Sequence, residues 1–304
     1  MKKTIAALLS ATVLLASCNQ YEKTPSGVKY KITKGGNKQT LKQGDFIKFN
    51  IEYKMPPKDS VFSSTFNRIP GYMLVDSARI PKHSFQEIVT KLAPGDKVDF
   101  VLSVDSLKKL GYLDYDNVFH ARDMIKGRAE IIKVLPGKES VEKDMESEMK
   151  VEKDREAKDL QTYLTKNNIK AQQTPSGAYV QVDRQGDGAK PDTGNQVKLM
   201  YRGSILGGKE FDTNMNPNGM NTQPLVVIIG AKGGNGSVIP GLDEGLRMFG
   251  KGGKGKVFIP AFAGYGAQGR APLIPPYASM VFDVEVVDIA TAPAPQPAPA
   301  MPRR

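Results

Sequence analysis

Apolar and polar residues alternate along several short segments of the chain, and two of these segments resemble each other. Residues 44–49 read Gly-Asp-Phe-Ile-Lys-Phe, and residues 194–199 read Gly-Asn-Gln-Val-Lys-Leu. Alternation with a period of two is typical of strands that bury one face. The motif Thr-Pro-Ser-Gly at 24–27 returns at 174–177 with the same offset. Self-similarity at a constant offset predicts two units of one architecture.

Each unit is predicted to contain one short helix followed by a strand. In the first unit, Ser84 and Glu87 fit a capping box at a helix start, and residues 97–104 form the next strand. In the second unit, the helix falls within residues 241–249 and the strand within 256–260. The pattern therefore predicts an α+β fold with two domains, each an antiparallel β-sheet wrapped on a short α-helix.

A charged segment separates the two predicted domains, which span residues 24–137 and 171–290. Residues 138–170 interleave acids and bases without glycine or proline, which favours a long exposed helix. Val141, Met145 and Met149 recur on one face of this helix, as they would in a homodimer seam. The stripe does not continue regularly beyond that point, so a solvated linker helix is the favoured interpretation and a homodimer the alternative.

Both ends of the chain have compositions unlike the domains. Lysines precede a short apolar run that ends in Leu-Ala-Ser-Cys at residues 15–18, which resembles a bacterial lipobox. Residues 1–18 are predicted to be a lipoprotein signal peptide, and an acylated Cys18 would anchor the protein to a membrane. The expected location is the cell envelope, facing the periplasm, with inner and outer membrane both open. Residues 291–304 are rich in Ala and Pro and are predicted to be disordered.

Composition narrows the possible chemistry. The net charge of +11 is spread through the chain, and in a secreted protein it favours solvation over nucleic-acid binding. Cys18 is the only cysteine, so an internal disulfide is excluded. His83 and His120 are the only histidines and have no regular ligand spacing. We therefore expect no metal and no cofactor.

Six segments of the second unit follow one another in an order and spacing that carry a resemblance. They are Tyr-Arg-Gly at 201–203, Lys-Glu-Phe-Asp at 209–212, Val-Ile-Pro-Gly-Leu at 238–242, Tyr-Gly at 265–266, Ile-Pro-Pro at 274–276 and Met-Val-Phe-Asp-Val-Glu at 280–285. Together they resemble the FK506-binding-protein (FKBP) family of peptidyl-prolyl cis-trans isomerases. The resemblance covers nearly the whole second domain.

The resemblance implies a pocket that rotates X-Pro bonds in unfolded or nascent envelope polypeptides. By family position, its residues are Tyr201, Phe211, Asp212, Val238, Ile239, Leu242, Tyr265, Ile274 and Phe282. The aromatic residues would form the walls, and the backbone amide of Ile239 would hold the substrate carbonyl after proline. Leu242 stands on the pocket floor, where most active relatives have Trp, so slower or differently selective catalysis is expected.

The first unit departs from the family pattern at the pocket positions. Ile51 aligns with Tyr201, and Ser63 aligns with Asp212. We interpret it as a degenerate FKBP-like domain with weak or no catalysis, used for spacing, dimer contact or holding unfolded chains. Two functions stay open: an isomerase and folding helper anchored by its lipid, or a non-catalytic peptide-binding or assembly lipoprotein.

Overall fold

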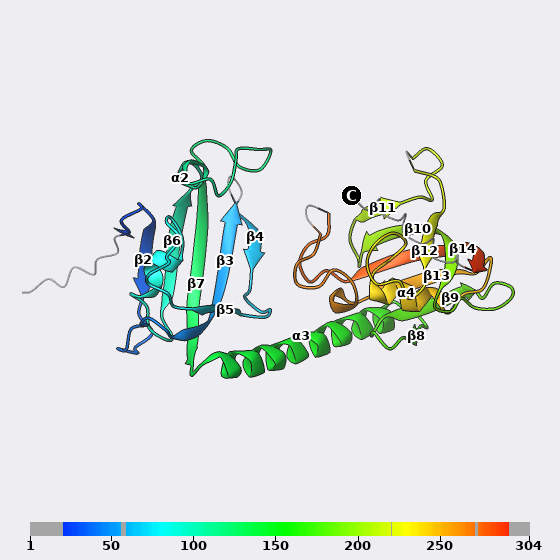
Figure 1. The fold of residues 1–304 in the computed structure, drawn as a ribbon, viewed down its shortest axis with the longest axis horizontal. Coiled ribbons are helices and arrows are strands. Elements are labelled where there is room, and N and C mark those ends of the chain that lie inside the picture. Colours follow the sequence, from blue (N-terminus) through cyan, green and yellow to red (C-terminus); the bar gives the residue numbers. More distant parts are fainter. Residues whose placement is uncertain (1–20, 56–58, 220, 271–272, 292–304) are drawn as a thin grey trace, which may run out of the picture. The chain divides into compact units, whose positions relative to one another are not determined.

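The computed structural model describes residues 21–55, 59–219, 221–270 and 273–291 (Figure 1). The chain divides into two compact units between Met149 and Lys150, within a long helix. The predicted signal peptide with Cys18, and the predicted tail apart from Thr291, lie outside the described residues. Their structure therefore stays a prediction.

The described part of the first unit contains a seven-stranded antiparallel sheet and two short helices. Its strands are β1 (Glu22–Lys23), β2 (Lys29–Thr33), β3 (Phe46–Met55), β4 (Ser60–Ser64), β5 (Gly71–Leu74), β6 (Lys97–Ser103) and β7 (Met124–Leu135); its helices are α1 (Gln86–Val89) and α2 (Val104–Lys109). The strand order is β1-β2-β6-β7-β3-β4, with β5 pairing β3.

The described part of the second unit repeats this arrangement. Its strands are β8 (Gln172–Gln173), β9 (Tyr179–Arg184), β10 (Asn195–Ile205), β11 (Glu210–Thr213), β12 (Leu225–Ile228), β13 (Lys254–Ile259) and β14 (Met280–Thr291); its helices are α4 (Pro240–Leu246) and the 3₁₀ turn η1 (Ala261–Ala263). The order is β8-β9-β13-β14-β10-β11, with β12 pairing β10. The predicted fold class is confirmed.

The core of each unit lies between the sheet and its short helix. On β10, Val197 and Leu199 are buried, as the alternating pattern requires. On α4, Leu242 and Leu246 are buried against the same core, and Gly245 lets the helix approach the side chain of Val257 on β13. Close packing at this glycine fixes the helix over the centre of the sheet.

The predicted capping box at α1 is wrong. Ser84 Oγ donates to the carbonyl of Pro81 at 2.7 Å, and α1 has no side-chain cap. The carboxylate of Glu87 instead accepts the hydroxyl of Ser26 at 2.7 Å and the N–H of His83 at 2.9 Å. The loop before the helix therefore takes the groups that a capping box would use, and Glu87 ties the helix to the Thr-Pro-Ser-Gly turn.

The charged segment forms α3 (Lys138–Lys166), which ends four residues before the predicted boundary. Only part of its middle is solvated, since the side chain of Val151 is 61% exposed whereas Glu152 and Glu156 are each 4% exposed. Its ends are not: Leu160 and Leu164 are buried against Phe258 of the second unit, and within the first unit Asp144 forms an ion pair with Lys48. The solvated linker therefore describes only part of the helix, and the homodimer stays a prediction.

Candidate active site

The predicted site residues of the second unit converge on one pocket of about 510 Å³ beside the N-terminus of α4. Its lining residues are Tyr201, Phe211, Asp212, Leu225, Ser237, Val238, Ile239, Pro240, Leu242, Tyr265, Arg270 and Phe282. Eight of the nine predicted residues line this pocket. The ninth, Ile274, is buried in the core cluster that backs it. We refer to this pocket as the cup.

Aromatic rings form one wall of the cup. Phe282 lies at the centre of the wall, 5.7 Å from the ring of Phe211 in an edge-to-face contact and 6.2 Å from the ring of Tyr201. Gly203 of β10 lies under both phenylalanines, because a Cβ there would come within 2.7 Å of Phe211 and 2.9 Å of Phe282. The wall therefore depends on a glycine that leaves room for two rings.

A polar pair stands at the rim. The hydroxyl of Tyr201 donates to Asp212 Oδ2 at 2.7 Å. Burial raises the pKa of Tyr201 well above its usual range, and the hydrogen bond to Asp212 raises it further. Tyr201 therefore keeps its proton at physiological pH, and one oxygen of Asp212 is committed to it.

A buried amide fixes the strand that carries Tyr201. Asn214, which is 1% exposed, accepts the N–H of Tyr201 at 2.6 Å through Oδ1. Its Nδ2 donates to the carbonyls of Leu199 and Gln223 at 3.0 Å each. The loop after β11 is thus held against β10, which sets the position of Tyr201 and Asp212 together.

The opposite side of the cup is formed by the start of α4 and the loop after η1. Ile239 has extended backbone angles, with φ −62° and ψ 146°, and Pro240 occupies the first helical turn. Arg270 Nη1 lies 3.5 Å from the hydroxyl of Tyr265. The backbones of Arg270 and Ile274 form an antiparallel bridge, which holds Arg270 beside the core residue Ile274.

Sequence reasoning missed Leu225, Ser237, Pro240 and Arg270 as lining residues. Pro240 lies within a quoted segment, and Arg270 lies between two of them, so position offered a signal for both. Leu225 is the first residue of β12, and Ser237 lies in the loop after this strand. Both positions depend on the long loops on either side of β12, whose path no local pattern fixes.

Comparison with known proteins agrees with this geometry. Residues 188–287 match the family described as FKBP-type peptidyl-prolyl cis-trans isomerase. An FK506-binding protein of Neisseria meningitidis serogroup B is 34% identical over 113 residues, which cover 37% of this chain and 96% of that protein. The chain belongs to the FKBP-type peptidyl-prolyl cis-trans isomerase family.

Longer members of the family match only in part. The probable FKBP-type peptidyl-prolyl cis-trans isomerase FkpA of the same Neisseria strain is 34% identical over 142 residues, 46% of this chain and 48% of that protein. This chain thus spans about half the length of that relative. The crystal structure of FkpA from Escherichia coli is 32% identical, with a TM-score of 0.38, over 51% of this chain and 70% of that one.

The first unit has strand positions that correspond to the cup's wall, but glycine and aromatic residues have changed places there. In the second unit, three residues that pair across neighbouring strands form a row that faces the core: Val257 on β13, Phe282 on β14 and Gly203 on β10. The register of the first unit places Phe100, Gly127 and Tyr53 in the same row across β6, β7 and β3. A β-bulge follows Tyr53 as it follows Gly203, which supports this alignment.

This exchange fills the space that the cup occupies in the second unit. The ring of Phe100 lies over Gly127, where a Cβ would collide with it, and packs edge-on against Tyr53 at 5.7 Å. Phe85 stacks on Phe100 at 5.6 Å. Phe62, which aligns with Phe211, is 61% exposed and contacts Phe119 instead.

The floor positions differ in the same sense. Glu87 and Glu244 each bind the serine of a Thr-Pro-Ser-Gly turn: Glu87 accepts the hydroxyl of Ser26 and Glu244 accepts the backbone N–H of Ser176, each at 2.7 Å. Phe85 and Leu242 stand two residues before these glutamates. The first unit therefore carries its floor aromatic where the second carries Leu242, which is 3% exposed.

Proposed function

We propose that the second domain catalyses cis-trans isomerisation of X-Pro bonds in polypeptides. The observation that carries the proposal is the cup itself: aromatic walls, an apolar floor and a polar rim gathered in one pocket of about 510 Å³. Family membership supports the same activity. The reaction requires rotation about a bond whose barrier is roughly 18–20 kcal/mol, and needs no nucleophile, metal or cofactor.

The cup would lower this barrier by desolvation and by shape. Moving the amide from water into a cup walled by Phe211 and Phe282 removes hydrogen bonds that stabilise its polar planar form. Wall contacts that fit the twisted amide better than either planar isomer would stabilise the transition state selectively. We refer to residues 238–240, which lead into α4, as the lip of the cup. The backbone N–H of Ile239 in this lip would bind a substrate carbonyl, and the rim pair of Tyr201 and Asp212 would orient the substrate.

The direct test is exchange of a proline tetrapeptide, measured by NMR in the presence of the purified chain. We expect accelerated exchange, and no acceleration over buffer at high protein concentration would overturn the proposal. Asp212→Leu and Tyr265→Phe should each lower kcat/KM while both domains still unfold cooperatively. Full activity in both variants would show that the rim is not part of the site.

The non-catalytic peptide-binding function is the alternative, and Leu242 on the floor favours it. The same experiment separates the two functions. A non-catalytic module would bind the tetrapeptide and shift its resonances without changing the exchange rate.

We propose further that the chain acts as a folding helper in the cell envelope, anchored through an acylated Cys18. The support is the lipobox-like sequence at residues 15–18. Within the described residues, no helix is both long and apolar enough to cross a membrane. Labelling of cells with a fatty acid should mark the wild-type protein and not Cys18→Ser, and label on both would contradict the anchor.

The first domain is proposed to hold unfolded clients. It exposes large apolar side chains, among them Phe62 at 61%, Tyr112 at 54% and Val118 at 48%. Such surface can bind exposed segments of another chain, and two weak sites on one chain benefit from effective concentration. Refolding of a proline-limited protein should slow in Phe62→Ser with Val118→Ser, whereas tetrapeptide exchange should not change.

A further inference from the structure

A second groove, larger than the cup, lies on the other side of the lip. It has a volume of about 610 Å³ and runs between α4, the glycine-rich loop after β12 and the turn before β9. Its lining residues are Gln173, Thr174, Pro175, Gly230, Ala231, Lys232, Val238, Pro240, Asp243, Glu244, Arg247 and Met248. Val238 and Pro240 line both the groove and the cup, so the two adjoin at the lip that these residues form.

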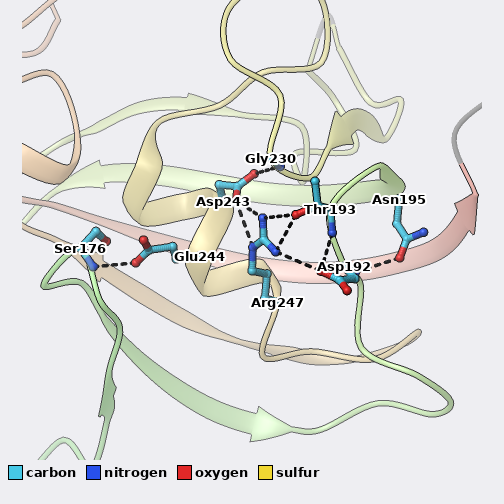
Figure 2. Close-up of polar contacts among 8 residues, drawn as sticks. All are labelled: Ser176, Asp192, Thr193, Asn195, Gly230, Asp243, Glu244 and Arg247. Carbon is cyan, nitrogen blue, oxygen red and sulfur yellow. Dashed lines mark hydrogen bonds and ion pairs between the residues drawn. The ribbon is translucent and has the colours of Figure 1, made fainter. Parts of the chain in front are cut away.

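Hydrogen bonds fix the walls of this groove (Figure 2). Asp243 Oδ1 accepts the N–H of Gly230 at 2.7 Å, which ties the glycine-rich loop to α4. Asp243 Oδ2 pairs with Arg247 at 3.1 Å, and Arg247 also donates to Thr193 at 3.2 Å. On the far wall, Glu244 accepts the N–H of Ser176 at 2.7 Å. The groove is therefore a built feature of the domain.

We propose that this groove binds the segment of a client polypeptide that follows the isomerised proline. The proposal rests on the proposed isomerase function, because the groove gains its role from its position next to the cup. A chain whose proline lies in the cup must leave it across a rim, and the lip at Val238 and Pro240 is the part of the rim that borders the groove.

The chemistry of the reaction selects the side of the proline. Isomerisation swings the residue before proline relative to the ring, whereas the residues after proline can stay in place throughout. A fixed groove that bound the preceding segment would favour one isomer and resist the rotation. A groove that binds the following segment holds the substrate in both isomers and in the transition state, so its binding energy raises kcat/KM.

The lining defines which segments fit. Pro175, Ala231 and Met248 give apolar surface. Both carboxylates in the walls have partners within the domain. The carboxylate of Asp243 binds Gly230 and Arg247, and the carboxylate of Glu244 binds Ser176. Lys232 adds an exposed positive charge. The groove therefore suits an extended apolar segment without positive charge.

The test compares three peptides on the full chain by exchange NMR: succinyl-Ala-Leu-Pro-Ala-amide, and the same peptide extended by Leu-Ala-Leu-Ala after or before it. We expect kcat/KM to rise about fivefold with the extension after proline, as partial burial of one leucine side chain would give. The extension before proline should change it little. Equal gains from both extensions, or no gain from either, would overturn the groove assignment.

Ala231→Trp should fill the groove and abolish the gain while leaving exchange of the short peptide unchanged. Ala189→Trp, at an exposed loop position outside the groove, is the matched control and should keep the gain. Lys232→Glu, at an exposed position that does not contribute to packing, should shift the preference of the groove toward a lysine-containing extension. If the wild-type chain does not accelerate exchange of the short peptide, the isomerase function itself is refuted. That result differs from a failure of the groove assignment alone. A change in oligomeric state on Ala231→Trp without loss of the gain would assign the groove to contact between copies and overturn the proposal.

Discussion

The two domains share a strand order and a position for the β-bulge, yet differ in one row of three residues. In the second domain, glycine at 203 and phenylalanine at 282 leave a hollow into which Phe211 folds. In the first, tyrosine at 53 and glycine at 127 stand in the opposite arrangement, and Phe100 fills the hollow from the neighbouring strand. The three residues of this row together therefore decide whether the sheet presents a cup or a packed core.

The comparison also explains where the aromatic residues of the first domain went. Phe62 cannot occupy the site of Phe211, because Tyr53 stands where Gly203 leaves room. It turns to solvent, where it contacts Phe119. The loss of a cup and the gain of exposed apolar surface thus have one cause, which links the weak catalysis expected of this domain with its proposed role in holding clients.

The largest effect is expected at the paired phenylalanines. Phe211→Ala should lower kcat/KM of the full chain about 100-fold, because truncation removes wall contact as well as packing. Phe62→Ala, at the aligned position of the first domain, should leave it unchanged. Tetrapeptide exchange on both variants gives the comparison. Substantial residual activity in Phe211→Ala, lost on adding Phe62→Ala, would show that the first domain is also a catalyst.

Gly203 and Gly127, the glycines of the two aligned rows, should respond differently to substitution by alanine. Gly203→Ala would push Phe211 and Phe282 apart and is expected to lower kcat/KM about tenfold. Gly127→Ala would collide with Phe100 and should destabilise the first domain by about 1–3 kcal/mol without affecting exchange. Calorimetry and exchange NMR on both variants separate the outcomes. Lowered activity in Gly127→Ala would mean that the first domain contributes to catalysis.

The sequence predicted the fold and most of the cup for the same reason. Alternation, the short helix and the repeat are local patterns, and the resemblance of the six quoted segments to the FKBP family implies pocket residues such as Tyr201, Phe211 and Asp212. What it did not predict depends on contacts between distant segments. The exchange of Gly127 and Tyr53 becomes visible only once the strand register is known.

The predicted capping box failed for a related reason. Ser84 and Glu87 have the right spacing, but Ser26, far away in sequence, donates to the Glu87 carboxylate. Likewise, the polarity of α3 did not indicate that Leu160 and Leu164 would be buried, because their partner Phe258 lies on a strand much later in the chain. Local patterns do not contain such pairings.

The attachment of α3 to the first domain should depend on pH. Burial alone would raise the pKa of Asp144, but hydrogen bonds from Lys133, Lys48 and Tyr72 lower it well below its usual range. A carboxyl with a depressed folded-state pKa stabilises the fold above its unfolded pKa of about 3.9, and this contribution is lost as pH falls below that value. Asp144→Asn should therefore cost about 1–2 kcal/mol at pH 7 and progressively less toward pH 2.5.

Thermal unfolding of both proteins across this range provides the measurement. The matched control is Leu164→Ala, at the end of α3 that packs on Phe258 through apolar contact. Its cost should be the same at every pH at which the second domain stays folded. A constant difference between Asp144→Asn and the wild type would show that the charge of Asp144 contributes nothing to the attachment.

The smallest effect is expected at the floor, where the domains exchange an aromatic for an aliphatic residue. Leu242→Trp would extend an aromatic surface into the cup from a position that is 3% exposed. Overpacking should cost about 1–3 kcal/mol of stability, while the added ring contact with the twisted amide should raise kcat/KM about threefold, which corresponds to about 0.7 kcal/mol. Phe85→Leu, at the aligned position of the first domain, should change stability without changing exchange. If Leu242→Trp folds and its exchange rate falls, the leucine is a fitted floor for this cup and the comparison with an aromatic floor is wrong.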